Sequence, residues 1–251
     1  MQLIHRLCDH FSDQAARVRV TSVTVGLRYT AVTTGDGGIG IAYTDTGEGH
    51  CCGSGKGYRN FEGRPAVELL ACLEDDAPLQ RSMALALVNA LNHARAGDFP
   101  EDATDGAWMD ALGIGQGSHV AMVGFFRPLM KKFKERGAII EVLDAGQGIG
   151  DCSEFYRRLE SWAEALLLTS TSILNGSTEE VLGRLTHGVK AVLLGPSTPM
   201  VPEAFTHLPV CLLAGTVPVD QEAVLRAVRH GQGTPVIHRF SRKVLVAVEG
   251  T

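Results

Sequence analysis

The sequence predicts an α/β protein built from two parts: a small α+β domain over residues 1–104 and a Rossmann-like, mainly parallel three-layer domain over residues 105–251. Three observations predict this fold. After the middle of the chain, short apolar runs alternate with helical segments. Before it, β-branched runs and helices follow one another without that alternation. Between them, residues 96–106 are acidic and broken by glycine and proline, which is typical of a linker.

The first part is expected to begin with a helix and a hairpin. Residues 1–19 have the pattern of an amphipathic helix. Residues 18–29 are rich in Val and Thr, and residues 30–34 continue this strand towards a glycine-rich turn at residues 35–38. The returning strand, Ile39–Tyr43, completes an antiparallel hairpin.

A long loop and two helices complete the first part. Residues 44–63 are glycine-rich and polar and lack any periodicity, and loops of this length are usually functional or disordered. Pro65 opens the first helix, because proline is favoured at the first helical position. Residues 77–94 form the second, since their apolar residues recur at helical spacing.

The second part begins at residues 119–128, HVAMVGFFRP. An apolar run, Val120–Val123, ends at Gly124, and Arg127-Pro128 opens a helix. A strand, a tight turn and a helix in this order form the first βα unit of a doubly wound fold. Further strands are expected at residues 138–143, 163–168, 190–194, 209–213 and 244–248, with helices at residues 129–136, 154–159 and 221–229 and after Ser177. This alternation predicts a parallel sheet with right-handed crossovers.

Composition narrows the class of protein. The net charge of -5 disfavours non-specific nucleic-acid binding, which needs a basic surface. No apolar run approaches the ~20 residues that span a bilayer, and the first residues lack the apolar core of a signal peptide. The six cysteines form no CxxC pair, so neither a zinc ribbon nor a thioredoxin motif is present. We expect a cytoplasmic protein without a membrane span.

The turn after Val123 places Gly124, Phe125 and Phe126 where dinucleotide-binding folds have a glycine-rich phosphate loop. Only the first glycine of that motif is present, although Asp144 follows by the ~20 residues expected of a ribose-binding acid. We expect the phenylalanines to line an apolar ligand wall or to pack between the domains. A Rossmann-type enzyme that uses a nucleotide or an S-adenosylmethionine-like cofactor remains the alternative.

Hydroxyl-rich segments follow the next strands. Thr169-Ser170-Thr171 ends one strand, and Asn175-Gly176-Ser177 precedes a helix. Free backbone N–H groups there could bind an anion or a carboxylate, although the same residues also serve turns and caps. Gly195-Pro196-Ser197 is the equivalent loop one strand later, and its prolines make it rigid. Ser197 lacks a GxSxG context, so we do not assign it as a hydrolase nucleophile.

A metal site is suggested by His50, Cys51 and Cys52 in the long loop. Imidazole and thiolate groups are good ligands for zinc, copper and other soft ions. Adjacent residues cannot complete a site alone, and topology offers Cys152 and Asp144 as further ligands. The competing interpretation is a loop that carries incidental thiols.

Six stretches together carry a resemblance to a known family: VTVGLRYTAV, GIGIAYT, LALVNALN, VGFFRP, LLLTSTSILNGSTEEVL and VLLGPSTPMVP. They resemble the bacterial and archaeal "putative heavy-metal chelation" proteins, in the same order and over nearly the whole chain. The resemblance implies an enolase N-terminal-like first domain, a Rossmann-like second domain and a cleft between them. It also implies a transition or heavy metal ion, or a small ligand that contains one, bound in that cleft.

The identity of the metal and the presence of any catalysed reaction are left open by the sequence. The expected partners are this small-molecule or metal ligand and, as an assembly state, a homodimer. A third class of function also stays open, that of an oligomeric structural or regulatory protein whose cleft has lost its role.

Overall fold

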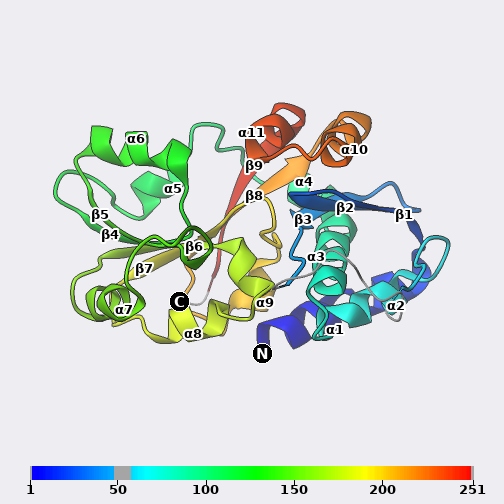
Figure 1. Cartoon of the computed structure of the whole chain (residues 1–251), viewed down its shortest axis with the longest axis horizontal. Coiled ribbons are helices and arrows are strands. Elements are labelled where there is room, and N and C mark those ends of the chain that lie inside the picture. The colour runs from blue at the N-terminus through cyan, green and yellow to red at the C-terminus, as the bar shows by residue number, and fades with distance from the viewer. Residues whose placement is uncertain (1, 48–57, 250–251) are drawn as a thin grey trace.

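The computed structural model describes residues 2–47 and 58–249 and contains two sheets that lie side by side (Figure 1). The smaller sheet has three strands in the order β1-β2-β3, and the larger has six in the order β5-β4-β6-β7-β8-β9. The predicted α/β class, with a small α+β unit before a mainly parallel Rossmann-like sheet, is confirmed.

The small sheet consists of β1 (Val20–Val25), β2 (Tyr29–Thr34) and β3 (Ile39–Tyr43), which pair antiparallel. One face packs against α3 (Pro78–Leu91). Gly40 allows this close approach, because a Cβ there would lie only 2.2 Å from the carbonyl oxygen of Ala86. The other elements of this part are α1 (Gln2–Arg17), α2 (Ala66–Leu70), η1 (Ala71–Leu73) and α4 (His93–Gly97).

The opposite face of the small sheet is covered by two helices from the end of the chain, α10 (Gln221–Arg229) and α11 (Thr234–Ile237), as Figure 1 shows. All six residues of β2 are buried, because both faces of the sheet are covered. The shared core contains Tyr29, Ala31, Ile39 and Ile41 from the sheet and Val224, Ala227, Val228 and Ile237 from the helices. Late residues therefore complete the core of the first part, and the predicted boundary between residues 104 and 105 stays a prediction.

The prediction of one continuous strand over residues 18–34 was wrong, since β1 and β2 are separate strands. The chain reverses at residues 26–28, where the N–H of Gly26 donates to the carbonyl oxygen of Tyr29 at 2.9 Å. A Cβ on Gly26 would lie 2.2 Å from the carbonyl oxygen of Val228 at the end of α10. This glycine thus marks a turn held under a helix that is distant in sequence, which β-branched composition alone could not reveal.

The large sheet is mainly parallel, as predicted. Its parallel strands are β4 (His119–Val123), β5 (Ile139–Leu143), β6 (Ala165–Thr169), β7 (Lys190–Leu194) and β8 (Leu212–Pro218). The last strand, β9 (Ser241–Ala247), runs antiparallel to β8. The predicted bounds of these last two strands, residues 209–213 and 244–248, were wrong. Every residue of β8 pairs with β9, and this pairing extends the strand beyond its apolar start.

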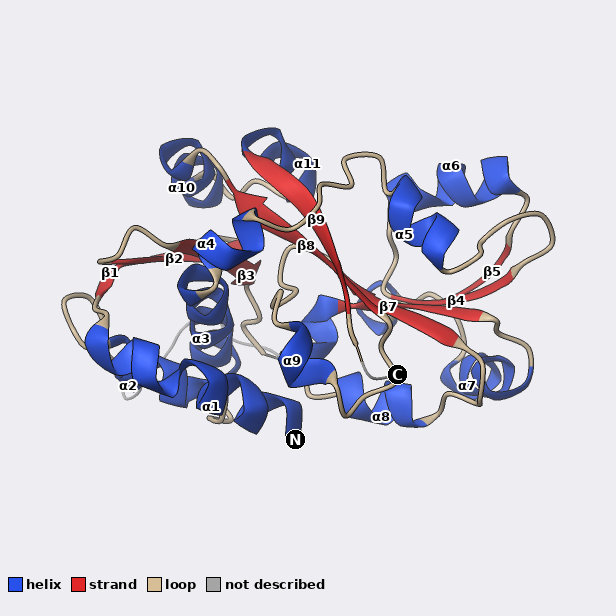
Figure 2. Ribbon diagram, turned by 180° about the vertical axis from the view of Figure 1, so that it is seen from behind, coloured by secondary structure: helices blue, strands red, loops and turns tan. Residues whose placement is uncertain are grey.

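Helices cover both faces of the large sheet (Figure 2). On one face lie α5 (Gly106–Ala111), which was not predicted, and α6 (Arg127–Arg136), with Trp108 and Phe133 buried beneath them. The other face carries α7 (Cys152–Ser161), α8 (Thr178–Gly183) and α9 (Pro202–Phe205). Short 3-10 turns complete the list: η2 (Ala145–Gln147), η3 (Ser170–Ile173) and η4 (His238–Phe240). Within residues 2–47 and 58–249, no helix is long and apolar enough to cross a membrane.

The acidic segment at residues 96–106 is held against the large sheet. Glu101 forms a bridge with Val244, and the N–H of Asp102 donates to the carbonyl oxygen of Lys243 at 3.0 Å. The carboxylate of Asp102 accepts hydrogen bonds from the N–H groups of Gly106 and Trp108 at the start of α5. Asp102 is only 7% exposed. The interpretation of this segment as a plain linker is therefore corrected, because its acids satisfy backbone donors that a helix start leaves free.

Candidate functional site

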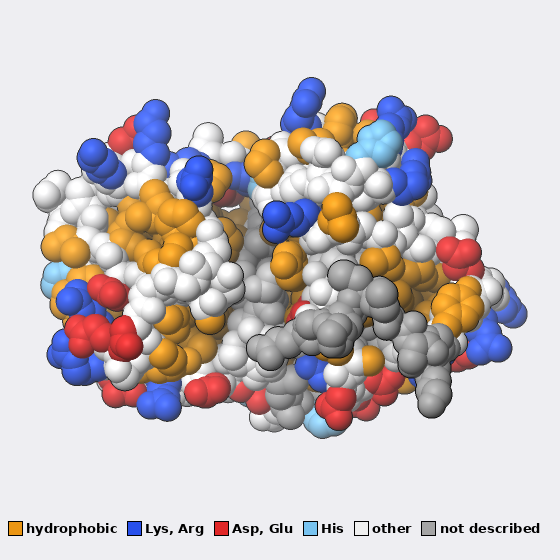
Figure 3. All heavy atoms as spheres, in the orientation of Figure 1, with side chains coloured by type: hydrophobic (Ala, Val, Ile, Leu, Met, Phe, Trp, Pro, Cys, Tyr) orange, Lys and Arg blue, Asp and Glu red, His pale blue; other side chains and the backbone are white. Residues whose placement is uncertain are grey.

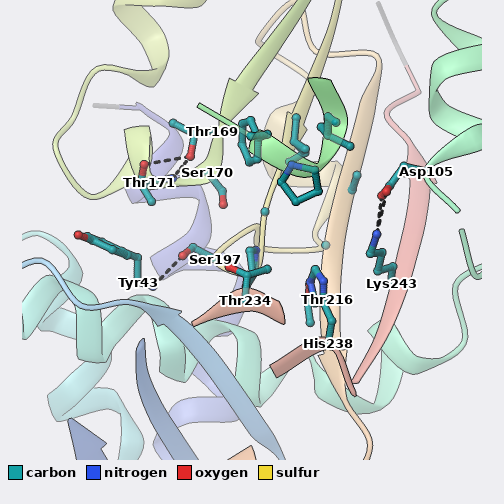
Figure 4. Close-up of a pocket in the computed structure, with 18 of the residues that line it drawn as sticks. Tyr43, Asp105, Thr169, Ser170, Thr171, Ser197, Thr216, Thr234, His238 and Lys243 are labelled. Atoms are coloured by element: carbon teal, nitrogen blue, oxygen red, sulfur yellow. Dashed lines mark hydrogen bonds and ion pairs between the residues drawn. The ribbon is translucent and has the colours of Figure 1, made fainter. Parts of the chain in front are cut away.

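A cavity of about 460 Å³ lies between the small sheet and the carboxyl edge of the large sheet (Figure 4). Its floor is formed by residues at the ends of β4, β6 and β7, and by β8 and β9. The opposite side is formed by Tyr29, Tyr43 and the start of α11. Small-molecule sites commonly have volumes of about 300–1,000 Å³ and lie at such sheet edges.

The walls of the cavity are predominantly apolar. They include Trp108, Phe125, Phe126, Leu129 and Leu194. In the space-filling view, a hollow separates the two halves of the molecule, and orange hydrophobic side chains gather beside it (Figure 3). Aromatic walls of this kind favour a ligand with a planar or apolar body.

Hydroxyl groups line the carboxyl edge. Thr169 Oγ1 and Thr171 Oγ1 share a hydrogen bond of 3.0 Å, and both residues lie beside Ser170 in Figure 4. Ser197 Oγ accepts a hydrogen bond of 2.8 Å from the N–H of Tyr43 on β3, which links the two parts of the chain. In that contact Ser197 Oγ is the acceptor. Its own O–H donates to no other described residue and stays available to a ligand.

His238 and Thr216 form a polar pair on the cavity wall. Thr216 Oγ1 lies 3.1 Å from His238 Nε2. Burial and, to a smaller extent, the positive charge of Lys243 lower the pKa of His238 to about 4, although the charge of Asp105 opposes this change. The imidazole is therefore neutral near pH 7, so the pair offers hydrogen bonds without charge. Next to it, Tyr29 OH and Thr234 Oγ1 are 2.6 Å apart.

Charged groups on the lining are mostly paired. Lys243 Nζ contacts both carboxylate oxygens of Asp105, at 2.9 and 2.8 Å. Asp102 is occupied by the start of α5. Arg127, at the start of α6, is exposed and forms no hydrogen bond or ion pair with another described residue. The cavity thus presents a guanidinium that is free to bind an anion.

Eight of the predicted site residues line this cavity: Phe125, Phe126, Thr169, Ser170, Thr171, Gly195, Pro196 and Ser197. Gly124 lies directly behind them with a φ of 87°, and a Cβ there would lie 2.9 Å from Thr169 Cβ. The carboxyl ends of parallel strands meet at one sheet edge, which is why three sequence-distant loops converge.

Like Gly124, four further predicted ligand-binding residues, Asp144, Asn175, Gly176 and Ser177, do not line the cavity. The carboxylate of Asp144 accepts from the N–H of Phe125 at 2.8 Å and from Gln147, so it orients the turn after β4. Asn175 Oδ1 accepts from the N–H and the hydroxyl of Ser177 in a local turn around Gly176. This is the turn chemistry that the sequence left open for residues 175–177.

Sequence reasoning missed several lining residues. Asp102 and Asp105 lay in the segment interpreted as a linker, and His238 had no spacing relation to other ligands. Tyr29 and Tyr43 lie on strands of the other part of the chain. The left-handed conformation of Asp105, φ 58°, leaves no sequence signal, because aspartate is common in ordinary loops.

The described residues do not provide a metal-binding cluster. Within residues 2–47 and 58–249, no group of three or more His, Cys, Asp or Glu side chains could hold a metal ion. The predicted ligands His50, Cys51 and Cys52 lie outside the described residues. Cys152 is exposed, and Asp144 is bonded to the backbone of its own sheet edge. The donor set on the cavity, hydroxyls, the single imidazole of His238 and one free guanidinium, does not fit a bare heavy-metal ion.

Two family models, each described as "Putative heavy-metal chelation", match residues 107–247 and residues 8–92. The chain belongs to this family. The resemblance seen in the sequence is therefore confirmed, although the description alone shows no binding. No curated protein matches the chain.

Two solved structures of proteins from the DUF364 family share this fold. One, from Pyrococcus horikoshii, has a TM-score of 0.80 at 18% identity and covers 98% of this chain and 100% of its own. The other, from Desulfitobacterium hafniense DCB-2, has a TM-score of 0.77 at 18% identity and covers 97% of both chains. Both proteins are described as having unknown function. The likeness therefore establishes the fold of this chain and says nothing of its chemistry.

Proposed function

We propose that the protein binds a small organic anion in the cavity, and that the metal named in the family description reaches the site as a complex with that anion. The observation that carries the proposal is the free guanidinium of Arg127 on a cavity lined mainly by apolar side chains and hydroxyls, where the other charged groups are hydrogen-bonded within the protein. This combination suits a carboxylate on a planar or apolar body.

Arg127 supplies the charge recognition. A guanidinium binds a carboxylate through two parallel hydrogen bonds, which a lysine cannot reproduce. Arg127 is also the first residue of α6, where the helix dipole adds positive potential. The hydroxyls of Ser170 and Ser197 are available to bind further ligand oxygens.

We assign the metal ion to the bound ligand, and not to protein side chains, because of the donor groups that the cavity offers. Since the described residues hold no cluster of metal-binding side chains, a metal ion in the cavity would rely on donors of the organic molecule. The hydroxyls and Arg127 would then bind the ligand's outer oxygens. Direct ligation by His50, Cys51 and Cys52 remains a separate proposal that rests on the sequence.

A nucleotide or S-adenosylmethionine-like cofactor has less support. That alternative needs Asp144 to reach a ribose, whereas its carboxylate bonds to Phe125 and Gln147 and does not line the cavity. The phenylalanines also occupy the position where a dinucleotide fold brings backbone against a pyrophosphate.

Isothermal titration calorimetry tests the proposal with pyridine-2-carboxylate and pyridine-2,6-dicarboxylate, each alone and with one equivalent of Zn²⁺. Arg127→Met should weaken binding at least tenfold, about 1.4 kcal/mol. Arg229→Met is the matched control, because Arg229 on α10 is also exposed and unpaired among the described residues but does not line the cavity. Failure of every probe to bind the parent, or equal binding by Arg127→Met, would overturn the proposal.

A further inference from the structure

Asp105 adopts a left-handed backbone conformation, with a φ of 58°. It is the one non-glycine residue with a positive φ in the described part of the chain, and its side chain is only 14% exposed. Such conformations persist where the surroundings over-determine them, and they cluster at ligand sites. The surroundings here are two lysines.

Lys132 on α6 and Lys243 on β9 share the carboxylate of Asp105. Lys243 Nζ lies 2.9 and 2.8 Å from the two oxygens, and Lys132 Nζ lies 2.5 Å from Oδ2. Burial by itself raises the pKa of Asp105, but the hydrogen bonds from Lys132 and Lys243 outweigh it, and the net pKa is lowered. The carboxylate therefore stays ionised, and within this group of three side chains two ammonium groups share one carboxylate.

The two lysines differ in what else they face. Lys132 also donates to the carbonyl oxygen of Thr104 at 2.5 Å and does not line the cavity. Lys243 lines the cavity, and two of its three N–H donors suffice for Asp105. No other described residue accepts from Lys243 Nζ, so one donor is left over. The ammonium group of Lys243 thus presents its remaining donor to the cavity.

The register of the large sheet also indicates that the side chain of Lys243 faces the cavity. Lys243 is the cross-strand partner of Thr216 in the antiparallel β8–β9 pair, and directly opposite residues project from the same face. Thr216 bonds His238 on the cavity wall. In Figure 4 the Asp105–Lys243 pair lies at one end of the labelled residues, and Thr169 and Thr171 lie at the other.

We propose that the ligand carries a second anionic group, and that Lys243, positioned by Asp105, binds it while Arg127 binds the first. This inference rests on the proposed function and narrows the ligand to a dianion with two separated acidic groups. Arg127 and Lys132 are five residues apart on α6, about 7.5 Å along the helix axis, and Asp105 lies between Lys132 and Lys243. Arg127 at the start of α6 and Lys243 on β9 thus reach the cavity from two different elements.

Calorimetry with benzoate, benzene-1,3-dicarboxylate, benzene-1,4-dicarboxylate and naphthalene-2,6-dicarboxylate tests this inference. The parent should bind at least one dicarboxylate tenfold or more tightly than benzoate. Lys243→Met should abolish that preference, and Lys243→Arg should restore part of it. Lys132→Met is the matched control, because it removes an ion pair from the same carboxylate without removing a group that lines the cavity.

The outcomes separate the two proposals. If benzoate binds through Arg127 but no dicarboxylate is preferred, the second anionic site is wrong and the proposed function stands. A preference that survives in Lys243→Met, or that vanishes equally in Lys132→Met, also overturns the inference. Absence of any binding by the parent, with Arg127 intact, overturns both. Thermal unfolding of each variant shows that the loss is measured on folded protein.

Discussion

The backbone N–H of Phe125 donates a 2.8 Å hydrogen bond to Asp144 Oδ2, and this contact ties the turn after β4 to the residue that follows β5. The same carboxylate accepts from the backbone and side chain of Gln147. Asp144 thereby fixes the turn that carries two aromatic residues of the cavity wall.

Asp144→Ala should destabilise the protein by about 1–3 kcal/mol, because it leaves the N–H groups of Phe125 and Gln147 without their acceptor. Asp144→Asn should cost less, since one carbonyl oxygen remains. Urea denaturation of the three proteins measures the difference. Equal stability of Asp144→Ala and the parent would show that water replaces the carboxylate without cost.

The stability of the protein should fall as the pH drops from about 6.5 to about 4. Burial lowers the folded-state pKa of His238 to about 4 from an ordinary 6.5, so the unfolded chain takes up the proton first. The contribution is fully present above pH 6.5, declines below it and levels off below pH 4. Its upper bound is roughly 3 kcal/mol. His238→Gln, measured by urea denaturation at pH 7, 5.5 and 4.5, should lack this decline, and parallel pH profiles would contradict the assignment.

Gly40→Ala should destabilise the small sheet by at least about 2 kcal/mol. The new methyl group would lie 2.2 Å from both the carbonyl oxygen of Ala86 and the N of Ala90, which are backbone atoms of α3 and cannot move aside alone. Gly97→Ala is the control, because its Cβ would meet nothing within 4 Å. Thermal unfolding should show a clear loss for the first variant and little change for the second.

Substitutions of Asp105 should separate backbone strain from ion pairing. Asp105→Ala and Asp105→Gly both lose the contacts to Lys132 and Lys243, but only glycine accepts a φ of 58° freely. Asp105→Gly should therefore be more stable than Asp105→Ala by about 1 kcal/mol. Chemical denaturation measures the difference, and the reverse order would mean that the segment relaxes to another conformation.

The sequence-based metal proposal predicts the behaviour of a double variant. Replacing Cys51 and Cys52 together with serine should weaken Zn²⁺ binding at least tenfold, and binding by the parent should weaken as the pH falls, because thiolates must lose protons to bind. Cys8→Ser is the control, since that half-buried thiol on α1 is not among the predicted ligands. Calorimetry with Zn²⁺ gives the affinities; equal values for the double variant and the parent would remove the loop from consideration.

The loops at residues 124–126, 169–171 and 195–197 could be predicted because each follows an apolar run, and parallel strands bring such ends together at one edge. Tyr29, Asp105 and Lys243 could not. They reach the cavity through the antiparallel return of β9, the packing of segment 101–105 on that strand and the cover of α10 and α11 over the small sheet. These are long-range pairings, and local periodicity carries no information about them.

The cover of the small sheet by α10 and α11 limits how this protein can be recombined with its relatives. A chimera that exchanges only residues 1–104 would place a foreign sheet under Val224, Val228 and Ile237, and a fragment of the first part alone would expose Tyr29, Ala31 and Ile41 to water. The cavity therefore requires both parts of the chain. During divergence, substitutions on β2 and on α10 should have been constrained as a pair, although some 190 residues separate Ala31 from Val224 along the chain.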